Sequence, residues 1–323
     1  MSNLKVLVTG GAGFIGSNFI KYILQDKEYE IINLDKLTYA GNKNNLVDIE
    51  NNKNYKFIKG DICNSNLVNK IVSKNIDVIL NLAAESHVDK SIENPNVFFK
   101  TNVLGTQTLL DAAVKYNVDK FIQISTDEVY GASNSKKFKN EEDCLSPTNP
   151  YSASKASADL LVLSYQKTYG LPVNISRSTN NYGPYQYPEK IIPLFITNLL
   201  DGKKVPLYGD GTHIRDWLYV KDHCQAIKLI MERGKEGETY NISGNNQYQN
   251  IELTKRILDL LNRPYTNIDY VNDRPGHDPG YYIDSSKIKK ELNWNPEFNI
   301  EEGLKKTVEW YKKNEVWWKE LVE

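Results

Sequence analysis

The chain has 323 residues, of which 40% are hydrophobic and 25% are charged, a composition typical of globular proteins. Its 40 basic and 41 acidic side chains nearly cancel, so we expect neither nucleic acid nor an anionic membrane as a partner. No apolar run reaches the roughly 18 residues that cross a bilayer, and the N-terminus lacks a secretory pattern. Three widely spaced cysteines, Cys63, Cys144 and Cys224, favour reduced thiols and a cytoplasmic location.

Short β-branched apolar runs alternate with helical patterns through the first half of the chain. The runs predict strands at 5–9, 30–34, 55–58, 78–82, 120–125 and 173–176. The patterns between them predict helices at 14–24, 65–74, 97–116 and 151–169. Apolar strands separated by helices indicate a parallel sheet covered on both faces, and right-handed crossovers make it a doubly wound α/β sheet of Rossmann type.

The pattern changes after residue 178. The segment 180–188 (NNYGPYQYP) predicts an irregular loop, and helices are expected at 191–200, 251–262 and 300–313, with turns at 273–280. We therefore predict a Rossmann domain over 1–178 and a smaller mixed domain over 179–323. Segments near 220–231 are expected to return to the first domain, so the boundary is interleaved, with return segments near 213–240.

A glycine-rich turn joins the first strand to the first helix. Gly10, Gly13 and Gly16 stand where a Cβ would obstruct the turn, the approach of backbone N–H groups to a pyrophosphate, or helix packing. The helix that begins near Phe14 and Ile15 would point the positive end of its dipole at the phosphates. The turn predicts dinucleotide binding.

An acidic residue follows at the position that such a site needs. Asp35 ends the second strand, nineteen residues after Gly16, where its carboxylate can accept hydrogen bonds from the adenosine ribose. That carboxylate would repel a 2′-phosphate, which favours NAD over NADP. The positive charge of the adjacent Lys36 is the one feature that would favour NADP.

Two further strand ends are candidates for the cofactor site. Asp61 and Ile62 could bracket the adenine, and the sequence Leu82, Ala83, Ala84 would let the cofactor lie against the backbone. For both, an ordinary strand end is the alternative.

Tyr151 and Lys155 lie four residues apart, on one face of the predicted helix. The ammonium can stabilise a phenolate and lower the pKa of the tyrosine. Tyr151 could then take the proton of a substrate hydroxyl while NAD takes hydride from its carbon. The pair alone is weak evidence among 21 tyrosines, but it follows a cofactor fold and the strand end at Ser125 and Thr126.

Together these features resemble the extended short-chain dehydrogenase/reductase family and, within it, the dTDP-glucose 4,6-dehydratases. The resemblance covers essentially the whole chain. It is carried by the motifs 35–42 (DKLTYAGN), 83–89 (AAESHVD), 125–131 (STDEVYG), 180–186 (NNYGPYQ), 215–220 (RDWLYV) and 273–278 (DRPGHD).

The resemblance implies a role for each catalytic residue. Tyr151 would remove the proton of the sugar 4-hydroxyl as hydride leaves C4, while Lys155 holds the nicotinamide ribose and Thr126 bonds the 4-oxygen. Glu128 would abstract the C5 proton, Asp127 would protonate the departing 6-hydroxyl, and hydride would return to C6. Two carboxyls must then act as base and as acid. Adjacent residues of a regular strand point to opposite faces, so the backbone must be irregular there.

The resemblance also implies which residues hold the ligands. It adds Leu37, Thr38, Thr101 and Asn181 to the cofactor site. At the substrate it places Thr126, Ser86, His87, Asn180, Lys190, Pro206, Leu207, Tyr208, Asn250, Asp273 and His277. Arg215 and Arg274 are the candidates for the substrate pyrophosphate, because guanidinium forks suit phosphate oxygens.

The chain departs from the family pattern in two places. Only nineteen residues separate Gly131 from Tyr151, a short connection that puts the usual lid in doubt. Pro279 and Gly280 stand where the family carries basic residues, which puts the nucleotide preference in doubt.

The histidines are scattered and no histidine–cysteine cluster has ligand spacing, so the sequence predicts no metal site. We interpret His213 and His223 as surface or packing residues.

A UDP-sugar 4-epimerase and a nucleotide-sugar decarboxylase of the same fold are the alternatives within enzymes. The former needs no carboxyl pair, and the latter typically has serine where Asp127 stands. GDP-mannose dehydratases favour NADP, and Asp35 counts against them because its carboxylate favours NAD. A catalytically idle protein that only senses NAD would have lost the catalytic residues, which this chain keeps.

The helices at 97–116 and 151–169 are more apolar than helices need to be when only one of their sides packs against the sheet. In the family such helices pair across a two-fold axis, so we predict a homodimer, with two core helices as the alternative. The resemblance further implies a place in deoxysugar biosynthesis, such as rhamnose or polysaccharide routes.

Overall fold

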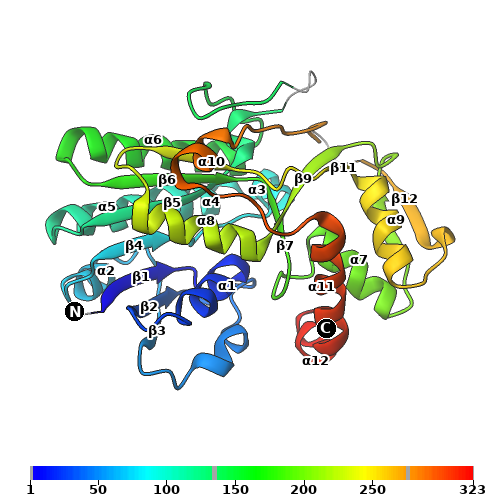
Figure 1. Ribbon diagram of the computed structural model, residues 1–323, viewed down its shortest axis with the longest axis horizontal. Coiled ribbons are helices and arrows are strands. Elements are labelled where there is room, and N and C mark those ends of the chain that lie inside the picture. The colour runs from blue at the N-terminus through cyan, green and yellow to red at the C-terminus, as the bar shows by residue number, and fades with distance from the viewer. Residues whose placement is uncertain (1–2, 133–136, 274–276, 323) are drawn as a thin grey trace.

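The computed structural model describes residues 3–132, 137–273 and 277–322 (Figure 1). Its centre is a seven-stranded parallel sheet with the strand order β10-β6-β5-β4-β1-β2-β3. The strands are β1 (Leu4–Thr9), β2 (Tyr29–Asp35), β3 (Tyr55–Lys59), β4 (Val78–Asn81), β5 (Lys120–Thr126), β6 (Val173–Ser178) and β10 (Thr239–Ile242). The predicted doubly wound sheet is confirmed, and β10 adds an edge strand that the sequence did not predict.

Helices cover both faces of this sheet. One face carries α1 (Phe14–Ile23), α8 (Val220–Arg233) and α10 (Ser286–Leu292), and the other carries α2 (Ser65–Val72), α5 (Thr106–Lys115) and α6 (Pro150–Tyr169). Side chains of a strand alternate between faces, so Val6 and Val8 enter the first core and Leu7 enters the second. This is why the strand is apolar throughout.

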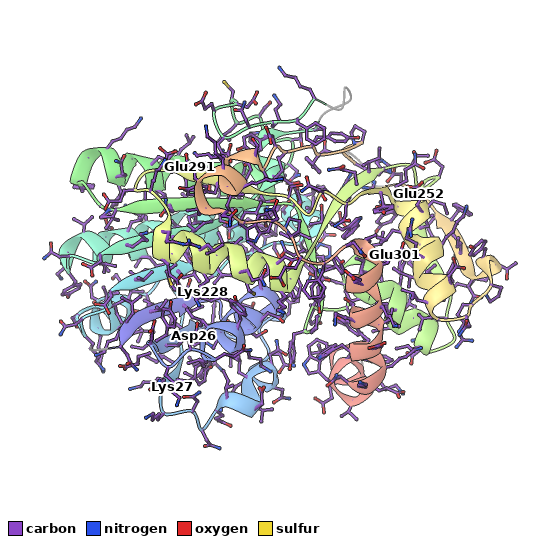
Figure 2. The ribbon with its side chains drawn as sticks, viewed as in Figure 1. Asp26, Lys27, Lys228, Glu252, Glu291 and Glu301 are labelled. Atoms are coloured by element: carbon purple, nitrogen blue, oxygen red, sulfur yellow. The ribbon has the colours of Figure 1, made fainter. Side chains whose placement is uncertain are left out.

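Helix α8 lies far along the chain but packs against α1, as the predicted return of 220–231 requires. Lys228 of α8 forms an ion pair with Asp26, which follows α1 (Figure 2). The exact division into two domains remains a prediction.

The predicted helix at 97–116 is wrong in its regularity. Residues there form α4 (Pro95–Phe98), a π-helical segment η2 (Phe99–Gly105) and then α5. Within η2, the buried side chain of Asn102 accepts the N–H of Glu85 and donates to the Glu85 carbonyl. Its amide also donates to Ser154 Oγ at 2.8 Å, so the side chain points into the protein. Such π segments occur often at functional sites.

A second lobe is built from short strands and four helices, with its own apolar core. The strands β7 (Asn180–Tyr182), β9 (Ile214–Tyr219) and β11 (Gln247–Gln249) form one small sheet, and β8 (Val205–Tyr208) pairs with β12 (Ile268–Val271). The helices are α7 (Ile191–Leu200), α9 (Asn250–Leu260), α11 (Ile300–Lys313) and α12 (Glu315–Val322). The three predicted helices are confirmed, and α12 extends the lobe beyond them.

The remaining short elements connect these layers: η1 (Lys43–Ile49), α3 (Val88–Glu93), η3 (Asp127–Tyr130) and η4 (Tyr265–Asn267). Among the described residues, no helix combines the length and apolar character needed to cross a membrane.

Candidate active site

A cavity of about 360 Å³ opens at the carboxyl ends of the central strands, where the second lobe meets the sheet. It brings together all five predicted catalytic residues, Thr126, Asp127, Glu128, Tyr151 and Lys155. It is also lined by every residue of the predicted cofactor set except Leu37. In a doubly wound fold, ligands bind at this edge of the sheet.

The glycine turn fits a pyrophosphate because it leaves room where side chains would stand. Gly10 has φ +69°, and a Cβ there would lie 2.7 Å from Ala83 Cα. A Cβ on Gly16 would lie 2.4 Å from the Gly10 carbonyl oxygen. The N-cap of α1 is Gly13, with no side-chain cap and no acid in the first turn, so the positive helix end faces the cavity.

Asp35 supports the same turn from the end of β2. Its two carboxylate oxygens accept backbone N–H groups of Ala12 at 2.9 Å and Leu37 at 2.7 Å. Burial raises the pKa of Asp35, while these two bonds oppose the rise. Beside it, Lys36 and Asp61 form an ion pair of 2.9 Å at the cavity wall. The donor set and the shape therefore fit NAD.

The backbone turns irregular at the point that the elimination chemistry requires. Thr126 ends β5 and caps the 3₁₀ helix η3, its Oγ1 accepting the Glu128 N–H at 3.3 Å. Because η3 replaces the strand, Asp127 and Glu128 both line the cavity instead of pointing to opposite faces of the sheet.

Asp127 is the more shielded of the two carboxyls. It is 3% exposed, and its Oδ1 accepts the Thr126 hydroxyl at 3.2 Å. Burial, with the nearby charges of Glu128 and Asp216, raises the pKa of Asp127 to about 8. The group is therefore protonated at neutral pH and can act as an acid.

Glu128 is tied to the helix that carries the tyrosine. Its Oε2 accepts the side-chain amide of Asn149 at 3.4 Å. Asn149 is also the N-cap of α6, where its side chain and that of Ser152 form a capping box. A cap of this kind stabilises a helix by about 1 kcal/mol, so the first turn of α6 is a firm support for the site.

Tyr151 and Lys155 both face the cavity from that helix, as the sequence predicts. Lys155 Nζ donates to the Ile124 carbonyl at 2.6 Å, and burial lowers the lysine pKa to about 8. Burial, followed by the charge of Glu128, raises the pKa of Tyr151 well above its usual value. The predicted lowering of this pKa by Lys155 is wrong here, because the ammonium donates to the Ile124 carbonyl and burial is the largest influence on the Tyr151 pKa.

Comparison with known proteins identifies the family. The family model described as GDP-mannose 4,6 dehydratase matches residues 7–307. The Low-salt glycan biosynthesis protein Agl12 of Haloferax volcanii is 49% identical, over 95% of this chain and 98% of its own. A dTDP-glucose 4,6-dehydratase of Streptomyces niveus is 47% identical, over 98% of this chain and 96% of its own. The crystal structure of DesIV, a dTDP-glucose 4,6-dehydratase from Streptomyces venezuelae with NAD and TYD bound, superimposes with a TM-score of 0.96. It is 47% identical and covers 98% of this chain and 100% of that chain.

The chain belongs to the nucleotide-sugar 4,6-dehydratase family. The resemblance on which the sequence prediction rested is thereby confirmed.

In this dehydratase, the predicted substrate residues fall into two groups. Ser86, Asn180 and Lys190 line the cavity with Thr126, and Lys190 Nζ donates to the Ser86 carbonyl at 3.1 Å. The others are not among the residues that line it: His87, Pro206, Leu207, Tyr208, Arg215, Asn250, Asp273 and His277. Arg274 lies outside the described residues.

Arg215 is close to the catalytic carboxyls although it does not line the cavity. Its guanidinium donates to the Asp278 carbonyl at 3.0 Å and lies 5.0 Å from the centre of the Tyr281 ring. Its charge acts against the raised pKa of Asp127. His87 caps α3 and lies 3.6 Å from Glu189, and burial lowers the pKa of His87.

Sequence reasoning missed several side chains that line the cavity. Glu189 lines the cavity, accepts the Tyr39 hydroxyl at 3.1 Å and lies 3.6 Å from Lys90 Nζ. Tyr187 and Trp217 line it as well. The available signal was the side-chain-rich loop at 180–188, which runs directly into Glu189.

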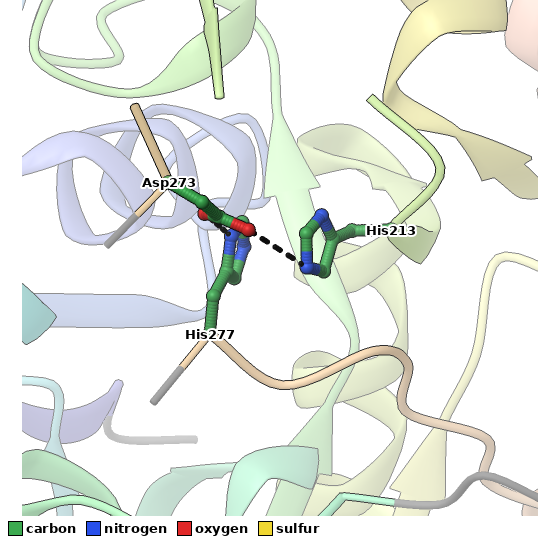
Figure 3. Close-up of side chains that lie close together, drawn as sticks. All are labelled: His213, Asp273 and His277. Carbon is green, nitrogen blue, oxygen red and sulfur yellow. Dashed lines mark hydrogen bonds and ion pairs between the residues drawn. The ribbon is translucent and has the colours of Figure 1, made fainter. Parts of the chain in front are cut away.

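Two histidines that the sequence left without a role have different surroundings. His223 is fully buried, with Nδ1 2.9 Å from Asn181 Oδ1, and burial lowers its pKa to about 3, as suits a packing residue. His213 instead stacks on His277, with ring centres 3.7 Å apart (Figure 3).

Proposed function

We propose that the protein converts dTDP-glucose to dTDP-4-keto-6-deoxyglucose by removing water, as a lyase that uses bound NAD internally. The observation that carries this proposal is the meeting of a Tyr–Lys pair with two carboxyls of different burial in one cavity beside the glycine turn. A plain dehydrogenase needs only the first pair. The names of the relatives and of DesIV support the same activity and the same cofactor.

Oxidation at C4 comes first. Tyr151 takes the proton of the 4-hydroxyl, and Thr126 holds the same oxygen. NAD, held by the glycine turn and Asp35, would supply the acceptor for the C4 hydride and the hydride that ends on C6. Lys155 stands one turn after Tyr151 on α6 and lines the same cavity, where it would hold the nicotinamide ribose.

Elimination follows, because the new ketone makes the C5 proton acidic. Glu128 takes that proton, and Asp127 gives its own to the departing 6-hydroxyl, which leaves as water. When hydride reaches C6, Glu128 returns a proton to C5. The environments suit this division, since burial and two neighbouring carboxylates keep Asp127 protonated at neutral pH.

The epimerase and decarboxylase alternatives leave this pair unexplained. A 4-epimerase requires no acid at C6, and a decarboxylase of this fold typically places serine at the position of Asp127. The inward position of Asp127, bonded by Thr126, supports dehydration.

The Asp127→Asn variant tests the assignment in single turnovers with dTDP-glucose. We expect water loss to slow by about 10²–10⁴-fold, and the first hydride transfer, followed as NADH absorbance, to slow much less. Asp119→Asn, an exposed change at the other end of the β5 segment, is the matched control and should behave as the parent. Equal slowing of both steps would remove the acid role of Asp127.

We further propose that the protein acts as a homodimer in the cytoplasm and supplies deoxysugar pathways such as those of rhamnose and polysaccharides. Elements α3, α4, η2 and α6 pack against one another, and we take the exposed apolar side chains that they carry as one face. This face carries Ile92, Val97, Phe99, Leu104 and Leu160, the last 60% exposed. Free cysteines support a reducing compartment.

Comparing turnover of dTDP-glucose and UDP-glucose tests the nucleotide preference.

A further inference from the structure

The peptide groups of Ala12, within the glycine turn, are held by residues from outside the turn. The Ala12 carbonyl accepts the side-chain amide of Asn45 at 2.9 Å and the backbone N–H of Asn42 at 3.0 Å. Its N–H donates to Asp35, and both Ala12 and Asn45 are buried. Because the atoms of a peptide bond share one plane, these bonds fix the orientation of the peptide that leads into Gly13, the N-cap of α1.

The C-terminal helix α12 reaches the same asparagine from the second lobe. Trp317 donates its indole N–H to Asn45 Oδ1 at 2.8 Å, across 272 residues of sequence. The next residue anchors the helix, because the buried Trp318 donates its own indole N–H to the Tyr311 carbonyl at 3.0 Å. The Trp317 ring also packs edge-on against Trp310 of α11, with ring centres 4.9 Å apart. Hydrogen bonds through Asn45 thus connect the second lobe to the glycine turn.

We propose that Asn45 and Trp317 are positioning residues for NAD, which hold the glycine turn in the shape that binds the pyrophosphate. Neither side chain is among those that line the cavity, so both act through Ala12. A turn rich in glycine loses much backbone freedom when a ligand orders it. Hydrogen bonds that order the turn beforehand lower this cost and so strengthen binding.

The indole N–H decides which way the Asn45 amide points. An indole can only donate, so it requires the amide oxygen of Asn45 on its own side. The amide nitrogen is then directed at the Ala12 carbonyl, which needs a donor. Trp317 therefore keeps Asn45 in the one orientation that serves the turn.

The bonds meet the turn at a point flanked by glycines of the cofactor site. Gly10 and Gly13 both line the cavity, whereas Ala12 between them does not. The Gly13 N–H donates to the Gly10 carbonyl at 3.2 Å, which ties the two glycines together. A shift of the Ala12 carbonyl would consequently move the surface that faces the pyrophosphate.

Calorimetric titration of the full-length protein, freed of its nucleotide, with NAD tests the proposal. Trp317→Phe keeps a ring in place and removes the indole N–H, and we expect it to weaken NAD binding by about threefold to tenfold. Asn45→Ala removes both bonds and should weaken binding by at least about tenfold. The matched controls are Trp310→Phe, in the same group of aromatic rings, and Asn44→Ala, the exposed neighbour of Asn45. Both controls should bind NAD as the parent does.

The double variant shows whether Trp317 acts through Asn45. If it does, Trp317→Phe has no further effect once Asn45→Ala is present, whereas independent losses would add. Circular dichroism and thermal unfolding of each NAD-free variant show whether it folds, and Trp317→Phe decides alone if Asn45→Ala does not fold.

Three results would overturn the proposal. The first is a folded Trp317→Phe or Asn45→Ala that binds NAD as tightly as the parent. The second is a double variant that shows the sum of both losses, and the third is a Trp310→Phe control that weakens binding as much as Trp317→Phe. NAD binding is measured without substrate, so none of these results depends on the proposed dehydration.

Discussion

Asp127 has the most strongly altered carboxyl environment of the catalytic set, and this has a consequence for stability. A free aspartate has a pKa of about 3.9, whereas burial raises that of Asp127 to about 8 in the folded chain. A raised folded-state pKa contributes stability that is fully present below about pH 4 and is lost as pH rises through about 8. The parent therefore loses stability over this window through Asp127 alone.

Asp127→Asn should remove this loss, because an amide carries no proton to give up. We expect the melting temperature of the variant, relative to the parent, to rise between pH 5 and pH 9. Thermal unfolding across this range measures the difference, and the exposed Asp119→Asn should show no such trend. A difference between Asp127→Asn and parent that is independent of pH would contradict the raised pKa.

At this scale, residue types could be predicted from the sequence but their environments could not. The Tyr151–Lys155 spacing and the adjacent carboxyls were visible because they are local patterns. The pKa of Asp127 also depends on Asp216 of β9, almost ninety residues away, which is bonded by Ser243 and by the Asn246 N–H. Only the folded chain brings that charge close.

Among the elements, the turn between β1 and α1 is the most exacting. Gly16→Ala would set a Cβ 2.4 Å from the Gly10 carbonyl oxygen, so the turn must shift away from the pyrophosphate position. We expect the variant to bind NAD at least tenfold more weakly, a loss of about 1.4 kcal/mol or more, and therefore to retain less NAD through purification. NAD extracted from equal amounts of protein measures this.

Gly170→Asn is the matched control. Gly170 ends α6 with φ +70°, nothing lies within 4 Å of a Cβ there, and asparagine tolerates this conformation. This variant should keep its NAD. Normal NAD content in a folded Gly16→Ala would contradict the role given to the turn.

Strongly periodic elements could be predicted, and irregular ones could not. The helices at 191–200 and 300–313 agree with α7 and α11 because their apolar spacing is regular. The π-helical η2 has no such signature, since it arises where Asn102 bonds Glu85 and Ser154. The four residues of β10 are a strand only because β6 lies beside them.

For the whole molecule, the apolar face over α3, η2 and α6 predicts self-association. Leu104 is 55% exposed and Leu160 is 60% exposed, so a charge at either position costs the monomer little. Leu104→Arg and Leu160→Arg together should convert a dimer to a monomer in sedimentation experiments, because two copies of each charge would meet at a two-fold interface.

Val316→Arg, on helix α12, changes an apolar residue that is still more exposed, at 74%, and should leave the dimer intact. A parent that sediments as a monomer would contradict the dimer, and a dimer that survives both leucine changes would place the interface elsewhere.

Long-range arrangement is what the sequence conveys least. The doubly wound sheet could be predicted because each strand and helix has a recognisable pattern of apolar residues in its own segment. The cluster of His213, Asp273 and His277 could not, because sixty residues separate the first two and the interpretation of the histidines as scattered followed from spacing alone. Arg274 and the turn around it lie outside the described residues, so that prediction stands as made.

The central claim is that oxidation at C4 serves an elimination across C5 and C6. The most direct measurement is turnover of dTDP-glucose in D₂O with the product examined by NMR and mass spectrometry. We predict a 4-keto-6-deoxy sugar with solvent deuterium at C5 and no net accumulation of NADH, because Glu128 exchanges the C5 proton while the hydride returns to C6. Release of dTDP-galactose without solvent deuterium would contradict the claim and assign the site to epimerisation.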